Sequence, residues 1–145
     1  MLTNKKISFS YREYESPEEL SREDLELVLK AREAAKHAYA PYSKYMVGAA
    51  LRLESGIIIQ GSNVENAASP SGICAEHTVA AGAVSNHPDD KPQALAIAAM
   101  NDEGTPAESV SPCGKCRQVL AEEEMRSGRK IRLILSGSNK TLVVE

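Results

Sequence analysis

The chain has 145 residues and a formal net charge of −3, with 42% hydrophobic and 26% charged residues. This length suits one domain with a hydrophobic core and is short for two. An acidic chain lacks the basic surface that attracts nucleic acids and anionic membranes, so we expect neither as a partner. We also expect a cytoplasmic protein, because no apolar run reaches membrane-spanning length and the N-terminus lacks a signal-peptide core.

The first predicted feature is an N-terminal extension over residues 1–16. Apolar residues alternate loosely with polar ones through Ile7, Phe9 and Tyr11. Such alternation predicts either an added edge strand or an arm that contacts a partner. A single domain is expected to follow over residues 17–145.

The domain begins with a predicted amphipathic helix. Ser16, followed by proline at the first helical position, is one candidate N-cap, and Ser21 with Asp24 is another. Apolar residues at three- and four-residue spacing extend the pattern to about Tyr39, and Pro41 stops it.

The rest of the domain alternates between predicted strands and helices. A hairpin turn at Glu54-Ser55-Gly56 joins the first two strands. The elements expected, in chain order, are strands at 45–53 and 57–62, a helix from 73 or 74 to 86, a strand at 94–100, a helix from 112 to about 126 with Val119, Leu120 and Met125 on its inner face, and strands at 131–135 and 141–144. This order predicts an α/β fold, a sheet of about five strands with helices on its faces.

All three cysteines lie in two short motifs. Cys74-Ala75-Glu76 has the form C-x-E, and Pro112-Cys113-Gly114-Lys115-Cys116 supplies P-C-x-x-C about forty positions later. This pattern is typical of zinc deaminases with three cysteine ligands. Three protein ligands leave the fourth position of tetrahedral zinc to water, as in catalytic rather than structural sites.

Both motifs are expected at the N-termini of helices. The helix dipoles would offset the negative charge of the cluster and, with the metal, keep the thiols deprotonated at neutral pH. Zinc in turn acidifies a bound water. Glu76, two residues from the first ligand, is therefore the candidate that carries protons to the ring nitrogen and the departing amine of a substrate.

Four ordered motifs make the chain resemble the small zinc cytidine deaminases of nucleoside salvage. They are Pro41-Tyr42-Ser43 with Val47-Gly48-Ala49-Ala50, Asn63-Val64-Glu65-Asn66-Ala67, Cys74-Ala75-Glu76, and Pro112-Cys113-Gly114-Lys115-Cys116-Arg117-Gln118. The resemblance implies a three-layer α/β/α sandwich with a mixed sheet and a homotetramer, a dimer being possible. It also implies hydrolysis of cytidine or deoxycytidine to the uridine product and ammonia.

The resemblance further implies a role for each matching residue. The zinc ion, one per subunit, would be bound by Cys74, Cys113 and Cys116, and protons would be transferred by Glu76. The nucleoside would be held by Asn63 and Glu65 at the ribose hydroxyls, by the backbone amide of Ala75 at the base, and by packing against Tyr45 and Val47. Residues at i and i+2 of an extended segment point the same way, as binding of a vicinal diol requires.

Some residues depart from the family pattern. His77 takes the place of an arginine, which predicts a more electron-rich zinc and a lower rate or a shifted pH optimum. Arg117 is a second candidate for charge compensation near the cysteines. Ser69 stands where a tyrosine is common, and the sequence ends at Glu145 without the aromatic segment that covers the base in relatives. An alternative substrate is therefore another aminopyrimidine nucleoside, such as a blasticidin-like antibiotic.

His77 also allows a non-catalytic interpretation. Cys74 and His77 are three positions apart, so on a helix both could face one metal ion. Together with Cys113 and Cys116 they would form a closed Cys₃His set, which is a structural zinc site without turnover.

Overall fold

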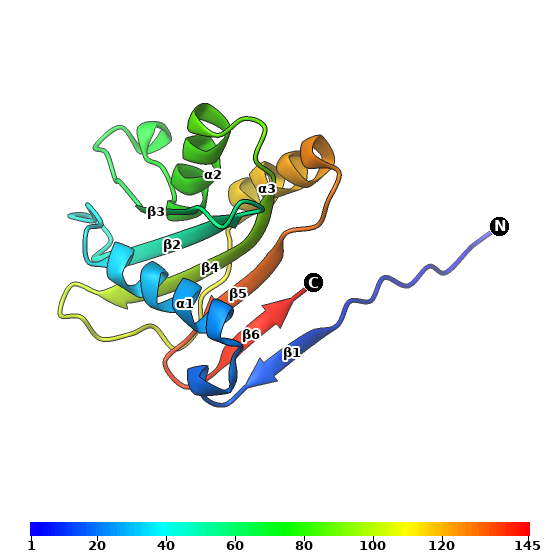
Figure 1. Ribbon diagram of the computed structural model, residues 1–145, viewed down its shortest axis with the longest axis horizontal. Helices are drawn as coiled ribbons and strands as arrows, with labels where there is room; N and C mark the ends of the chain where they lie inside the picture. Colours follow the sequence, from blue (N-terminus) through cyan, green and yellow to red (C-terminus); the bar gives the residue numbers. More distant parts are fainter.

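A mixed sheet of six strands forms the middle layer of the structure, a computed structural model of residues 1–145 (Figure 1). The strands lie in the order β1-β6-β5-β4-β2-β3, and only β4 and β5 pair in parallel. The bounds are Tyr11–Tyr14 for β1, Tyr45–Leu53 for β2, Ile58–Ser62 for β3, Pro92–Asn101 for β4, Arg132–Ser136 for β5 and Thr141–Val144 for β6. The predicted α/β sandwich is confirmed, with six strands in place of about five.

Helices cover both faces of this sheet and give it two cores. On one face α1 (Arg22–Ala35) packs through Leu27, Val28 and Ala31. On the other face lie α2 (Ala75–Asn86) and α3 (Gly114–Ser127). Successive residues of β2 and β4 point alternately into the two cores, as the period of a strand requires. Two short 3₁₀ helices, η1 (Pro17–Glu19) and η2 (Ser69–Ser71), complete the fold.

The start of β2 is held very close to α1. A Cβ atom on Gly48 would lie 1.9 Å from the backbone oxygen of Ala31, so only glycine fits there. This contact fixes the strand end that carries Tyr45 and Val47, two of the predicted site residues.

Both candidate helix starts are used. The Ser16 hydroxyl accepts a hydrogen bond from the Glu18 backbone N–H at the start of η1, and Ser21 caps α1 in the same way through Asp24. The predicted extension of the helix to Tyr39 is wrong, because α1 ends at Ala35. The Tyr39 N–H donates instead to the carbonyl of Asn63, which ties this segment to the chain beyond β3.

The predicted inner face of α3 is partly wrong. Leu120 is buried, but Met125 is 72% exposed. The five positions between them turn the helix by about 140° beyond a full turn, which carries Met125 away from the sheet.

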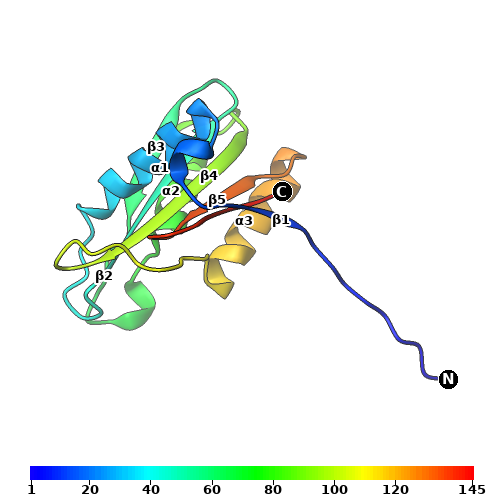
Figure 2. The same ribbon diagram turned by 90° about the horizontal axis from the view of Figure 1, so that it is seen from below.

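Part of the N-terminal extension joins the sheet. β1 pairs antiparallel with β6, with Tyr11 opposite Val144. The predicted added edge strand is thus present, and it supplies the sixth strand. Residues 1–10 continue as an extended segment away from the body of the molecule (Figure 2).

The three α-helices are too short or too polar for a membrane span.

Candidate functional site

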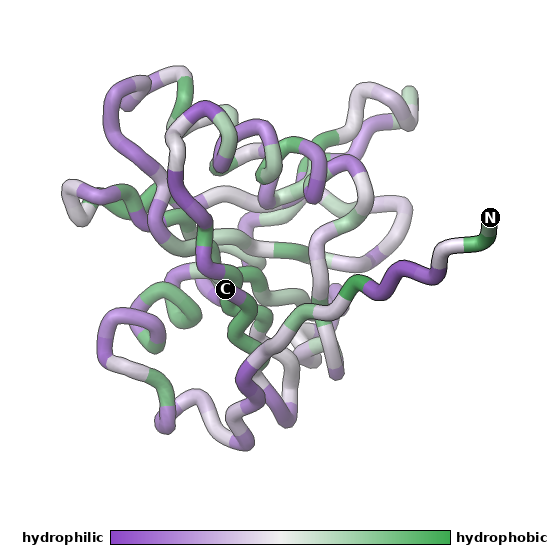
Figure 3. Tube along the Cα trace, turned by 90° about the vertical axis from the view of Figure 1, so that its right-hand side faces the viewer, coloured by the Kyte–Doolittle hydropathy of each residue, from purple (hydrophilic) through white to green (hydrophobic).

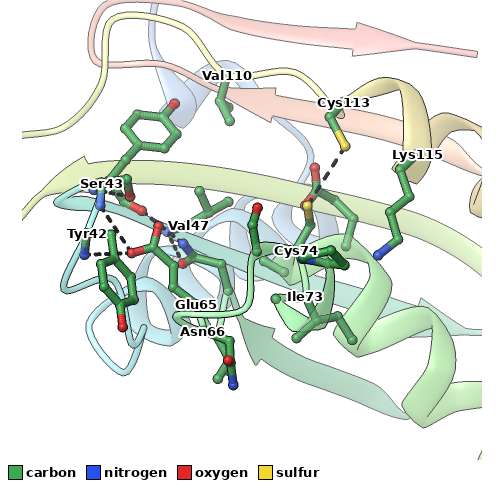
Figure 4. Close-up of a pocket in the computed structure, with 18 of the residues that line it drawn as sticks. Tyr42, Ser43, Val47, Glu65, Asn66, Ile73, Cys74, Val110, Cys113 and Lys115 are labelled. Carbon is green, nitrogen blue, oxygen red and sulfur yellow. Dashed lines mark hydrogen bonds between the residues drawn. The ribbon is translucent and has the colours of Figure 1, made fainter.

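A pocket of about 730 Å³ opens where β2 begins and where α2 and α3 have their N-termini. Figure 4 shows Glu65 beside Tyr42 and Ser43 at one end, and Cys74, Cys113 and Lys115 at the other. Eight predicted site residues line this pocket: Tyr45, Val47, Asn63, Glu65, Cys74, Ala75, Glu76 and Cys113. The tertiary structure therefore brings residues of all four sequence motifs to one cavity.

The three cysteines form one cluster beside the pocket. Cys74 is the N-cap of α2, Cys113 is the N-cap of α3, and Cys116 lies buried in the first turn of α3. Their sulfur atoms all lie within 4.8 Å of one another, and Cys74 Sγ is 3.8 Å from Cys113 Sγ. Tetrahedral zinc with bonds of about 2.3 Å requires a sulfur–sulfur separation of about 3.8 Å. The donor type and its spacing thus fit a zinc ion.

Burial opposes ionisation of two of these thiols. It raises the pKa of Cys74 and that of Cys116, and for Cys116 the nearby Glu76 carboxyl adds to the effect. The pKa of Cys113 is lowered, chiefly by the backbone N–H of Cys116, which donates to its sulfur at 3.5 Å. Of the three thiols, therefore, only that of Cys113 has its pKa lowered by the protein groups alone. A bound cation would favour proton loss from the other two, as the prediction of a metal-assisted cluster assumes.

Glu76 lies in the first turn of α2 and is only 5% exposed. Burial raises the pKa of its carboxyl, and its own backbone N–H and the Cys116 thiol oppose this effect. The carboxyl lines the pocket but is not part of the metal-binding group. A carboxyl in this position, beside a group of metal-binding side chains, can accept a proton and donate it again.

Asn63 connects the chain after β3 to the start of β2. Its Oδ1 accepts from the Val47 N–H at 2.8 Å, and its Nδ2 donates to the Tyr45 carbonyl at 2.9 Å. The side chain therefore holds the pocket wall in place. An amide has two donors and two acceptor sites, so one of each remains for a ligand.

Glu65 is held by the loop that precedes β2. Its Oε1 accepts hydrogen bonds from the backbone N–H groups of Tyr42, at 3.0 Å, and Ser43, at 3.1 Å. The Ser43 hydroxyl and these two N–H groups lower the pKa of the Glu65 carboxyl. Glu65 is consequently an anchored anion, and it lines the same pocket as Asn63, as their i and i+2 spacing predicts.

Tyr45 and Val47 form part of the wall between the two ends of the pocket. Burial, and after it the charge of Glu76, raises the pKa of the Tyr45 phenol. The phenol is therefore neutral at physiological pH, and the wall at this point is an uncharged surface suited to an aromatic ring.

His77 does not complete a closed metal site. The group of side chains close enough to hold a metal contains the three cysteines and no histidine. His77 does not line the pocket, and its Nδ1 atom is buried without a hydrogen-bond partner. The predicted Cys₃His set is therefore not assembled, and the open arrangement of three thiols is the one observed.

Arg117 lies outside the pocket and is exposed. Its Nε atom donates to the Pro112 carbonyl at 3.0 Å. The contact fixes the turn that carries Cys113 at the start of α3, which is a local structural role beside the cluster.

Several pocket residues were not identified as site residues from the sequence. Lys115 is the single cationic residue that lines the pocket, and its place between Cys113 and Cys116 was the available signal. Val110 lies in the loop before α3, where no pattern in the sequence marked it.

Comparison with known proteins places these features in a family context. The zinc-binding region of cytidine and deoxycytidylate deaminases matches residues 21–128. A cytidine deaminase of Sporosarcina psychrophila is 46% identical over 96 residues, which cover 66% of each chain. A blasticidin-S deaminase of Bacillus cereus is 35% identical over 105 residues, or 71% of this chain and 74% of that protein. The crystal structure of a cytidine deaminase from Burkholderia pseudomallei has a TM-score of 0.68 at 30% identity, covering 82% of this chain and 90% of that one.

Proposed function

Because the chain belongs to the family of zinc-binding cytidine and deoxycytidylate deaminases, we propose that it hydrolyses cytidine or deoxycytidine to the uridine product and ammonia. The observation that carries this proposal is one pocket that combines two chemistries. Three thiols within 4.8 Å lie beside the Glu76 carboxyl at one end, and Asn63 and Glu65 offer polar groups at the other. In the cell, this activity would serve pyrimidine salvage.

Zinc would be held by Cys74, Cys113 and Cys116, one ion per subunit. The 3.8 Å separation of the first two sulfur atoms supports this ligand set. When bound, zinc supplies Lewis acidity, which makes water a nucleophile at neutral pH.

Glu76 would move the protons of the reaction. In our proposal its carboxylate takes a proton from the water that attacks C4 of the cytosine ring and passes it to the ring nitrogen. Glu76 would then take the proton of the hydroxyl group added at C4 and give it to the amino group. The bond between C4 and this nitrogen breaks, ammonia leaves, and C4 becomes the carbonyl carbon of the uridine product. The raised pKa of this buried carboxyl supports the role, because efficient acid–base catalysis needs a pKa near the working pH.

The remaining pocket residues would position the nucleoside. Asn63 and Glu65 would bind the ribose hydroxyls, and Tyr45 with Val47 would pack against the base. The Ala75 backbone N–H would donate to the base, which is supported by the lack of a side-chain cap at the start of α2. A vicinal diol would satisfy the acceptor sites of Glu65 that its backbone partners leave free.

A second candidate substrate is an aminopyrimidine nucleoside antibiotic of the blasticidin type. The 35% identity to the Bacillus cereus blasticidin-S deaminase supports it. The higher identity of 46% to a cytidine deaminase favours cytidine.

We also propose a homotetramer, with a dimer as the smaller alternative. In α2, small and apolar residues occur around the whole helix, including Ala81 and Val84 outside the core. A helix that is apolar all round is normally buried on every side. A neighbouring subunit over this face would cover it and could offer a partner to the buried Nδ1 atom of His77.

The test is a deamination screen on zinc-loaded protein. The substrates are cytidine, deoxycytidine, cytosine, methylated cytidines and aminonucleoside antibiotics. Deamination of each is measured as a change in ultraviolet absorbance. Cytidine and deoxycytidine should be converted, and Glu76→Gln should bind zinc without turnover. Failure of the folded, zinc-loaded parent to convert any of them would refute the proposal.

A further inference from the structure

The first ten residues form an arm that leaves the body of the protein where β1 begins (Figures 1 and 2). The arm is exposed along its whole length. It contains no backbone hydrogen bond to the rest of the chain, whereas the four residues of β1 that follow pair with β6. The arm thus continues β1 as an extended segment, and neither edge of the arm is hydrogen-bonded to another strand.

Apolar side chains are repeated along one side of this arm and at the start of β1. Ile7 is 96% exposed, Phe9 is 80% exposed and Tyr11 is 54% exposed. Their i, i+2, i+4 spacing puts them on the same side of an extended chain. Figure 3 shows a hydrophilic stretch near the N-terminus, followed by a hydrophobic position on the way to the body of the molecule. The chain exposes its single phenylalanine in this arm.

This apolar side continues an existing core. Tyr11 lies opposite Val144 in the β1–β6 ladder, and Val144 packs against the core beneath α2 and α3. Cross-strand partners share a face of the sheet, so Tyr11, Phe9 and Ile7 prolong that face beyond the molecule.

The outer edge of β1 is open for pairing. β1 is the first strand in the sheet order, so one of its edges is bonded to β6 and the other has no neighbour. Residues 1–14 contain no proline, and the β1–β6 ladder shows no register shift. Proline and bulges are two of the devices by which proteins block an exposed edge.

We infer that residues 5–13 form an antiparallel strand pair with the same segment of a second copy of this chain, about a two-fold axis at Phe9. In this register Phe9 lies opposite Phe9 of the second copy, and Ile7 lies opposite Tyr11. It is the register in which all three apolar residues face one another. Centring the pair on Ser10 instead would put Ile7 opposite Glu13.

Charge gives this register one favourable and one unfavourable cross-strand pair. Lys5 lies opposite Glu13 of the second copy, an attractive cross-strand pair. On the opposite face Lys6 lies across from Arg12, an unfavourable like-charge pair that Glu145, 3.7 Å from the Arg12 guanidinium, weakens. The partner of this surface is therefore a second copy because the apolar side of the segment complements itself in this register.

This interface is separate from the face of α2. β1 and β3 are the two opposite edges of the sheet, and α2 packs over β3. The pairing also stands apart from the proposed activity, because none of its residues lines the pocket.

Cysteine cross-linking tests the register directly. With Phe9→Cys, the two introduced thiols lie opposite each other at a Cα separation of about 4.5–5.5 Å, which a disulfide can span. Mild oxidation should give a covalent dimer. The matched variant Ile7→Cys puts its two copies about 13 Å apart along the ladder, so it should give at least tenfold less dimer. The parent, with its three native cysteines, gives the background.

Either of two results would overturn the pairing. One is a yield of cross-linked Phe9→Cys no higher than that of the parent. The other is equal cross-linking of both variants, which would indicate random collision.

The assembly mass gives a second, independent measurement. Phe9→Ser should halve the mass measured by light scattering at a fixed concentration, and Leu2→Ser should leave it unchanged. Both side chains are exposed within one subunit, so neither change should affect folding. If Phe9→Ser leaves the mass of the assembly unchanged, the proposed pairing of the arms is rejected.

Discussion

The two ends of the pocket differ in how far the protein itself satisfies their polar groups. At the metal end, which Cys74, Cys113 and Cys116 form, burial raises the pKa of Cys74, Cys116 and Glu76 more than the neighbouring hydrogen bonds lower it. At the other end, called the ribose end after the role proposed for it, Asn63 and Glu65 already accept hydrogen bonds from the backbone. The metal end therefore depends on a cation for its working state, whereas the ribose end is assembled in advance. Substitutions at the metal end should therefore abolish activity almost completely, whereas substitutions at the ribose end should reduce it by degrees.

Removal of zinc should have the largest effect. Cys116→Ala leaves two thiols of the cluster, so the protein should lose its metal in gel filtration and lose detectable cytidine turnover. Chelation of the parent should have the same result, and added zinc should restore the parent but not the variant. Full activity in protein that elemental analysis shows to be metal-free would contradict the conclusion that the metal end depends on a cation.

Glu76→Gln should be next in size. The amide keeps the shape of the side chain but cannot take up a proton, so kcat should fall by about 10²–10⁴-fold. Zinc content should stay at the parental level, because Glu76 is not in the metal-binding group. Loss of zinc in this variant would instead give the carboxylate a role as ligand or as support for the cluster.

Glu65→Gln should give an intermediate effect that depends on the substrate. A hydrogen bond to a charged group contributes about 1.5–3 kcal/mol, so KM for cytidine should rise by about 10–100-fold with a smaller change in kcat. The rate with free cytosine, which has no ribose, should be unchanged. Equal loss with both substrates would remove Glu65 from the ribose end.

Asn63→Ala should lower stability as well as binding. It removes the partners of the Val47 N–H and the Tyr45 carbonyl, so the free energy of unfolding should fall by about 1–3 kcal/mol in urea titration. Asn66→Ala is the matched control, because Asn66 lines the same pocket but bonds only to the exposed turn at Ala68. A similar loss in both variants would argue against a bridging role for Asn63.

His77→Arg should have the smallest effect. A fixed positive charge on α2 should move the pH–rate profile towards lower pH, because it favours the deprotonated form of the attacking water. The shift should be below about one pH unit, since His77 neither lines the pocket nor belongs to the metal-binding group, so its charge acts on the attacking water only at a distance. Profiles that superimpose would show that residue 77 does not act on the cluster.

Local sequence alone determined which residues form the cysteine cluster, where η1 and α1 begin, and the limits of β2 and β6. Caps, turns and C-x-x-C spacing act within one or two helical turns, so they can be recognised from neighbouring residues. Chemical type also fixed Cys74, Cys113 and Cys116 as a set, because no other residue in the chain offers a thiol.

Distant contacts decided what local patterns left open. The helix ends at Ala35 because Tyr39 bonds to Asn63, and β1 joins the sheet because β6 offers an edge. The pKa of Glu76 is raised by residues packed around it from other elements, and the absence of a histidine from the metal cluster depends on where α2 and α3 lie. Burial and hydrogen-bond partners of this kind arise only when separate elements pack together, so the sequence could name the reactive groups but only the tertiary structure could assign their environments.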